Sequence, residues 1–159
     1  MKMLLIAAML LLSLPAFAQD QDQAPAEDSP AGISLDGVWR SDAGLLEAEK
    51  LLGEKKYTEA LTVLDDIITR NMRNADAHVY SAVAWLNLGN KDKAKTELTN
   101  ALAIDRGHMG AYVMSGLVAL MENNLTQANY FLSALKVVCR GTMCPEYQRL
   151  QKIIREMGQ

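Results

Sequence analysis

The chain is 159 residues long, half of them apolar and 6% aromatic, and its formal net charge at pH 7 is -3. That length allows one domain of ordinary size. A small negative charge with no local surplus of Lys or Arg argues against a protein that coats nucleic acid, so no nucleic-acid partner is expected.

Residues 1–18 have the three-part layout of a secretory signal peptide. Lys2 precedes an apolar run, and a small-residue cleavage motif ends at Ala18, ahead of polar residues. The run is shorter than the about 20 residues that a spanning helix needs, so an uncleaved membrane anchor is the weaker alternative. We expect cleavage after Ala18 and a periplasmic protein that is exported and, after signal cleavage, soluble with no membrane span.

Residues 19–42 carry six Asp and Glu against one base, Arg40. Such a stretch buries too little apolar surface to offset its ordering entropy, which predicts an acidic, largely disordered linker. Apolar residues return near Trp39. Two interpretations stay open for Trp39: it packs against the first helix, or it is an exposed anchor for a partner.

Every segment beyond residue 42 has helical periodicity, and none shows the alternation of a strand. Glycine, asparagine and proline mark the breaks between segments. The predicted helices cover residues 43–54, 57–70, 75–89, 91–104, 109–122, 125–139 and 145–157. The sequence therefore predicts an all-α protein of short antiparallel hairpins.

Small residues recur in these helices with a period of 34. The positions in the second helix of each hairpin are Ala60, Ala94 and Ala128, and those in the first helix are Ala48, Ala82 and Gly116. Two helices joined by a short turn approach closely only where one of them has little side chain. The recurrence therefore predicts three similar hairpins.

A 34-residue helix-turn-helix period resembles the tetratricopeptide repeat family. The resemblance implies an antiparallel helix-hairpin solenoid of three tetratricopeptide-like repeats over residues 43–143, closed by a capping helix over residues 144–159. Ile67 and Leu135 replace a usual small residue in the first and third repeats, and the first repeat departs most from the family because Gly44 also weakens its start. The apolar stripe of the capping helix is Tyr147, Leu150, Ile153, Ile154 and Met157.

The resemblance also implies a binding surface, because first helices of successive units in the family line a groove that holds a partner's peptide. The corresponding positions here are Val79, Val83, Leu86, Asn87, Val113, Leu117, Leu120 and Met121. Both helices are apolar nearly all round, so a partner, neighbouring helices or the segment around Trp39 must cover the spare face. The lysine and asparagine clamp for a terminal carboxylate is not seen at these positions, which argues against a chaperone-tail receptor.

Cys139 and Cys144 lie between the last two predicted helices. Two cysteines this close in an exported chain predict a structural disulfide, worth about 2 kcal/mol for so short a loop. A catalytic dithiol normally has two intervening residues rather than four, and a zinc site needs two further ligands that no nearby His supplies. We expect no metal and no cofactor.

No motif supports catalysis, and His78 and His108 are predicted to be ordinary histidines without a metal. The expected function is therefore that of a non-catalytic adaptor or scaffold of the cell envelope, which binds a segment of another envelope protein. Two alternatives stay open. One is a permanent structural subunit of a larger membrane-associated complex, and the other is a thiol-disulfide protein that uses the two cysteines.

Overall fold

The computed structural model describes residues 43–157, which fold into seven helices and contain no strand. The helices are α1 (Ala43–Gly53), α2 (Tyr57–Arg70), α3 (Ala75–Asn87), α4 (Lys91–Ile104), α5 (Met109–Met121), α6 (Leu125–Val138) and α7 (Pro145–Met157). The predicted boundaries agree with these to within two residues. The expected signal peptide, the expected acidic linker and Trp39 lie outside the described residues.

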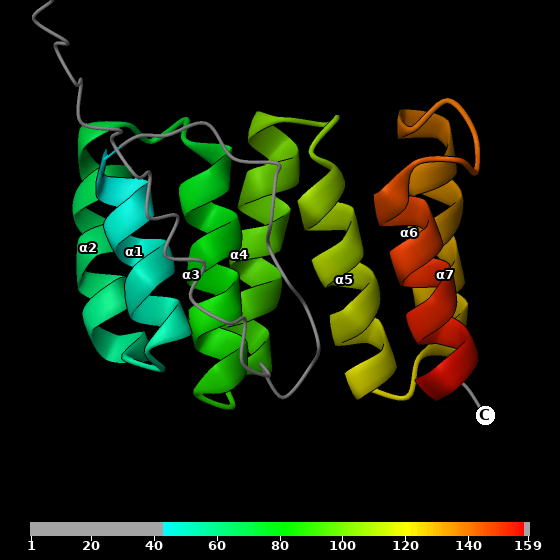
Figure 1. Cartoon of the computed structure of the whole chain (residues 1–159), viewed down its shortest axis with the longest axis horizontal. Helices are drawn as coiled ribbons and strands as arrows, with labels where there is room; N and C mark the ends of the chain where they lie inside the picture. Colours follow the sequence, from blue (N-terminus) through cyan, green and yellow to red (C-terminus); the bar gives the residue numbers. More distant parts are fainter. Residues whose placement is uncertain (1–42, 158–159) are drawn as a thin grey trace, which may run out of the picture. The chain divides into compact units, whose positions relative to one another are not determined.

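The helices pair into hairpins that stack side by side (Figure 1). Within each hairpin α1 packs on α2, α3 on α4, and α5 on α6. The first helices also contact one another in succession, α1 with α3, α3 with α5, and α5 with α7, so these four form one layer. The all-α helix-hairpin solenoid predicted from the sequence is confirmed.

The turn inside each hairpin repeats with the same period as the alanines. Lys55, Gly89 and Asn123 stand 34 residues apart, and their φ angles are 60°, 78° and 58°. This left-handed backbone costs glycine nothing and penalises residues with a Cβ. Three different residue types therefore share one left-handed φ at the same position of each hairpin.

Side-chain caps start four of the helices. Asn74, Asn90 and Asn124 each accept a hydrogen bond from the backbone N–H three residues on, at the starts of α3, α4 and α6. His108 does the same for α5 through Nδ1, which accepts the Ala111 N–H at 3.1 Å. Each cap satisfies a backbone donor that a helix start leaves without an intrahelical acceptor.

The small residues lie where helices pack most closely. All five alanines of the two series are fully buried. A Cβ added to Gly116 would lie 2.7 Å from Leu150 Cδ1, because α7 packs directly on this point of α5. The close-packing positions read from the sequence are confirmed.

The last helix, α7, closes the stack as predicted, with Tyr147 and Leu150 buried and Ile153 and Ile154 half-buried. The predicted apolar stripe is one residue too long, since Met157 is 53% exposed. Ile153 and Ile154 already pack near Leu120 at the end of α5, and Met157 lies a turn beyond them. No described helix has the length and apolar character that crossing a bilayer requires.

Candidate partner-binding surface

Four of the eight positions expected to line a groove are buried, so the expectation of an open surface is wrong for them. They are Val79, Val113, Leu117 and Leu120. Val113 packs in a cluster with Tyr147 and Leu150, and Leu120 packs with Ile153 and Ile154. The physical reason at these two positions is that α7 covers the face of α5 that the family pattern leaves open.

Val83 also belongs to the interior, since it is half-buried and packs against the cluster formed by α1, α2 and α3. Of the remaining positions, Leu86 is half-buried, and Asn87 and Met121 are exposed. These three lie in the last turns of α3 and α5. The surface available to a partner is therefore smaller than expected and lies at one edge of the layer.

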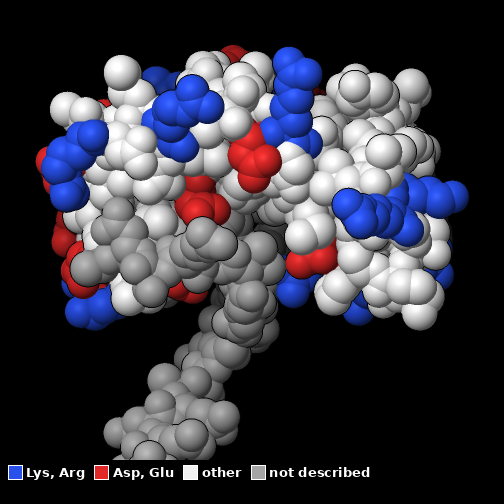
Figure 2. Space-filling model, turned by 90° about the horizontal axis from the view of Figure 1, so that it is seen from above, with Lys and Arg blue, Asp and Glu red and all other residues white. Residues whose placement is uncertain are grey.

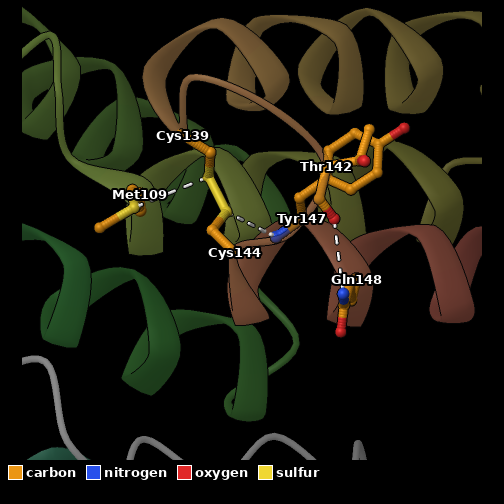
Figure 3. Close-up of a disulfide and its surroundings, with 6 residues drawn as sticks. All are labelled: Met109, Cys139, Thr142, Cys144, Tyr147 and Gln148. Carbon is orange, nitrogen blue, oxygen red and sulfur yellow. Dashed lines mark hydrogen bonds between the residues drawn. A yellow bond between two sulfur atoms is a disulfide. The ribbon is translucent and has the colours of Figure 1, made fainter.

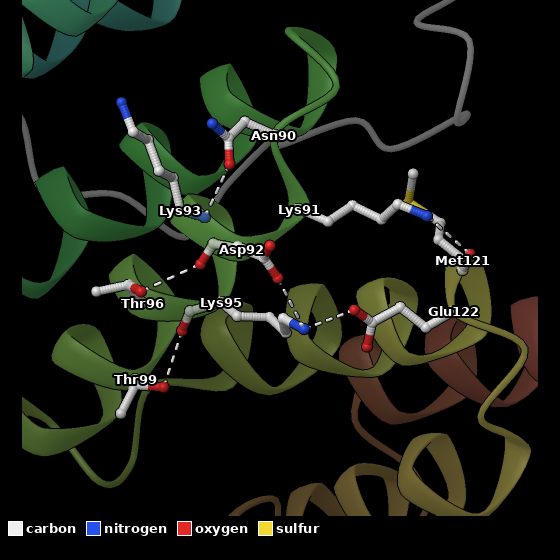
Figure 4. Close-up of polar contacts among 9 residues, drawn as sticks. All are labelled: Asn90, Lys91, Asp92, Lys93, Lys95, Thr96, Thr99, Met121 and Glu122. Carbon is white, nitrogen blue, oxygen red and sulfur yellow. Dashed lines mark hydrogen bonds and ion pairs between the residues drawn. The ribbon is translucent and has the colours of Figure 1, made fainter.

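We define the edge patch as Leu86, Asn87, Leu88 and Met121. Leu88 is 45% exposed and Met121 39% exposed. Lys91 Nζ, from the first residue of α4, donates to the Met121 carbonyl oxygen at 3.2 Å and so joins the start of α4 to the end of α5 (Figure 4). The sequence prediction missed Leu88, because the family positions that it followed end at Asn87.

Charged side chains of α4 border this patch. Lys95 Nζ lies 2.6 Å from Glu122 Oε1 and 3.2 Å from Asp92 Oδ1. The hydrogen bond to Glu122, followed by that to Asp92, raises the pKa of Lys95. Lys93 Nζ stands 3.8 Å from the centre of the Trp85 ring. Lys91 and Lys95 therefore extend toward the end of α5, whereas the Lys93 side chain points away from it (Figure 4).

Acidic and basic side chains are interspersed on the face shown in Figure 2, and neither sign covers it. This agrees with the sequence, in which residues 43–159 hold 14 Lys and Arg against 13 Asp and Glu. The face shown therefore carries no single-sign field.

Both histidines are buried and paired with carboxylates. His78 Nδ1 lies 2.6 Å from Glu97 Oε2, which links α3 to α4. His108 Nε2 lies 2.9 Å from Asp76 Oδ1, which links the start of α5 to the start of α3. The sequence prediction missed these partners because they are 19 and 32 residues away. The two pairs tie neighbouring helices together.

The structure joins Cys139 and Cys144 in a disulfide between the end of α6 and the start of α7, with Cα atoms 5.9 Å apart (Figure 3). The pairing is the one that the spacing suggests. Its formation in the cell stays a prediction. Met109 Sδ, from the first residue of α5, lies 3.8 Å from Cys139 Sγ.

Residues 51–114 match the family model described as "Tetratricopeptide repeat". The match runs from the end of α1 into α5 and so covers the centre of the stack. A comparison with curated proteins gives no match. Over residues 51–114 the chain is therefore similar to tetratricopeptide repeats.

Solved structures of the same fold align with most of the chain. The TPR2B domain of yeast Sti1, in a complex titled pHsp70, is 15% identical with a TM-score of 0.66, covering 72% of this chain and 93% of that one. The Arabidopsis OM64 TPR domain is 19% identical with a TM-score of 0.63, covering 72% and 93%. The second TPR domain of human RPAP3, with the HSP70 peptide SGPTIEEVD, is 17% identical with a TM-score of 0.61, covering 70% and 92%. At these identities the likeness shows the fold.

Proposed function

We propose that this protein is a non-catalytic adaptor of the cell envelope that binds a segment of another protein at the edge patch. The observation that carries the proposal is an exposed apolar patch on the first-helix layer of a tetratricopeptide-repeat stack. Domains of the same fold, those of yeast Sti1 and human RPAP3, were solved with partner peptides. A repeat stack without a catalytic motif acts through such surfaces.

The chemistry of the patch favours a partner segment with apolar and acidic residues. Leu86, Leu88 and Met121 offer apolar contact. Lys91 and Lys95 beside the end of α5 favour carboxylates, although Glu122 and Asp92 already engage Lys95. The carboxylate clamp that would hold a chain terminus is absent from the matching positions, so the segment is proposed to be internal.

The envelope location rests on the first 18 residues. Their basic start, apolar run and small-residue end are the pattern of a cleavable export signal. A pair of cysteines five residues apart is also suited to an oxidising compartment, where a disulfide persists. We therefore propose the periplasm as the site of action and an envelope protein as the partner.

The test is photo-crosslinking in cells with the probe placed at position 88, compared with Met121→Glu and Met72→Glu variants of the same protein. Met72 is a matched control because it is 77% exposed and lies in the α2–α3 connection. We expect Met121→Glu to abolish the crosslinked product and Met72→Glu to retain it, with both variants folded by circular dichroism. Equal products from both variants would remove the edge patch as the binding surface.

Size-exclusion chromatography separates the adaptor from the permanent subunit of a larger complex. An adaptor elutes as a monomer or small oligomer after mild extraction, with the partner bound only in part. An obligate subunit stays with its complex throughout, and Met121→Glu then lowers the amount of protein in the cell, because an unassembled subunit exposes its interface.

A further inference from the structure

Three sulfur atoms, one from α5 and two from the α6–α7 connection, lie together near the C-terminal end of the stack. Met109 is the first residue of α5, Cys139 follows α6, and Cys144 precedes α7. In Figure 3 the Met109 side chain points toward the cysteine pair, and its Sδ is 3.8 Å from Cys139 Sγ. This cluster is separate from the edge patch and has no part in the proposed function.

A carboxylate stands beside the sulfur atoms. Ligand atoms of Cys139, Cys144 and Glu146 all lie within 4.8 Å of one another, and the three residues are half-buried. Met109 is half-buried as well. An ion can therefore reach the cluster from solvent and lose part of its water shell there. The sequence analysis considered only histidine as an additional metal ligand beside the two cysteines. It therefore missed this cluster, in which the additional groups are a thioether and a carboxylate.

We propose that, when the disulfide is reduced, Cys139, Cys144 and Met109 bind one Cu(I) ion. Thiolate sulfurs bind Cu(I) as well as Zn(II), and a softer thioether as the third ligand favours Cu(I) over Zn(II). Three sulfurs arranged around one ion at about 2.3 Å stand about 4 Å apart. The observed 3.8 Å between Met109 Sδ and Cys139 Sγ fits that spacing.

The fold also favours the charged form of Cys144 that a metal requires. The Tyr147 N–H donates to Cys144 Sγ at 3.4 Å, in the first turn of α7. Backbone donors at a helix start stabilise negative charge, because the helix dipole has its positive end there. The Cα atoms of the two cysteines are 5.9 Å apart, so both thiolates reach one ion without unfolding α6 or α7.

The two states interconvert by a balanced exchange. A dithiol reductant gives two electrons and two protons to the Cys139–Cys144 bond and is itself oxidised to a disulfide. The two new thiols then release both protons as Cu(I) binds, which leaves a complex of charge -1 with the neutral Met109 sulfur as third ligand. A disulfide oxidant reverses the exchange: it takes two electrons from the two thiolates, is itself reduced to a dithiol with two protons from solvent, and the re-formed Cys139–Cys144 bond releases the ion.

Titration of the purified full chain tests this proposal. The chain is reduced with a phosphine under nitrogen and then mixed with the coloured Cu(I) complex of bicinchoninate, which fades as protein removes the ion. We expect one Cu(I) bound per reduced chain and none per disulfide-bonded chain. Cys144→Ser should abolish binding. Met109→Leu, which keeps the volume and removes the sulfur, should weaken it by about tenfold or more.

The matched control is Met143→Leu, since Met143 lies in the same loop and is 84% exposed. It should leave the Cu(I) affinity unchanged, and circular dichroism should show all variants to be folded. Failure of the reduced chain to take Cu(I), or an unchanged affinity in Met109→Leu, overturns the proposal. A larger loss in Glu146→Gln than in Met109→Leu overturns it too, because an oxygen-dependent site is one for Zn(II).

Discussion

Single residues decide how closely the helices of this stack approach. Gly116 lies under Leu150, whose side chain is fully buried between α5 and α7. Tyr80 is fully buried in α3. A methyl group added at position 116 must displace packed atoms, and a charge formed on Tyr80 must be buried with it. Both consequences can be measured.

We expect Gly116→Ala to lower the free energy of unfolding by about 1 kcal/mol, because overpacking against Leu150 outweighs the better helix propensity of alanine. Gly53→Ala is the matched control, since a Cβ there meets no atom within 4 Å and should stabilise slightly. Urea unfolding measures both. Leu150→Val combined with Gly116→Ala should cost less than the sum of the single changes, and additive costs would contradict the clash.

The buried Tyr80 predicts a loss of stability in alkali. Burial is the main cause that raises the pKa of Tyr80, and the negative charges of Glu49 and Asp76 raise it further. Above pH about 10 the unfolded chain releases this proton and the folded chain keeps it, so stability falls as pH rises, by about 1.4 kcal/mol per unit. Tyr80→Phe should lose less stability than the natural chain between pH 10 and 11. Tyr130→Phe, at a 63% exposed position, should follow the natural chain.

At the scale of the elements, the sequence predicts most of what is observed. All seven helices follow from apolar spacing and from turn residues, since these are local signals. The 34-residue recurrence identifies close-packing positions such as Ala82 and Gly116. It does not reveal that α7 covers Val113 and Leu120, because the packing of a last helix depends on tertiary contacts that no local spacing encodes. The sequence does not predict the pairing of His108 with Asp76 for the same reason.

The repeated turn provides a prediction for the hairpins. Lys55 adopts the left-handed backbone that Gly89 adopts in the next repeat. We expect Lys55→Gly to raise the free energy of unfolding by about 1 kcal/mol, because it removes a Cβ from that conformation. Gly89→Ala should lower it by a similar amount. Thermal melting of the two variants gives the comparison, and shifts of the same sign in both would contradict the shared turn geometry.

At the scale of the whole molecule, the chain combines an export pattern with a helical stack whose last helix is joined by a disulfide to the helix before it. The function proposed here depends on both parts. The stack supplies the edge patch, and residues 1–18 supply the compartment in which the patch would meet an envelope protein. Whether residues 1–18 are removed can be measured directly from the mass of the protein.

We expect the protein isolated from the periplasmic fraction to begin at Gln19 and to contain no free thiol. Intact mass spectrometry reads the first point, and alkylation without prior reduction reads the second. A mass that includes residues 1–18 would contradict cleavage. Addition of two alkyl groups to unreduced protein would contradict the disulfide in the cell and would leave the reduced cluster of Cys139, Cys144 and Met109 as the resident state.

The contact pattern of the stack has a kinetic consequence. Within residues 43–157 each helix contacts only its neighbours in the chain or the next helix but one. Proteins built from such short-range contacts have low contact order and fold in microseconds to milliseconds, because no distant segments must first find each other. A newly exported chain of this kind would bury its apolar layer one hairpin after another, in the order in which the hairpins emerge into the receiving compartment.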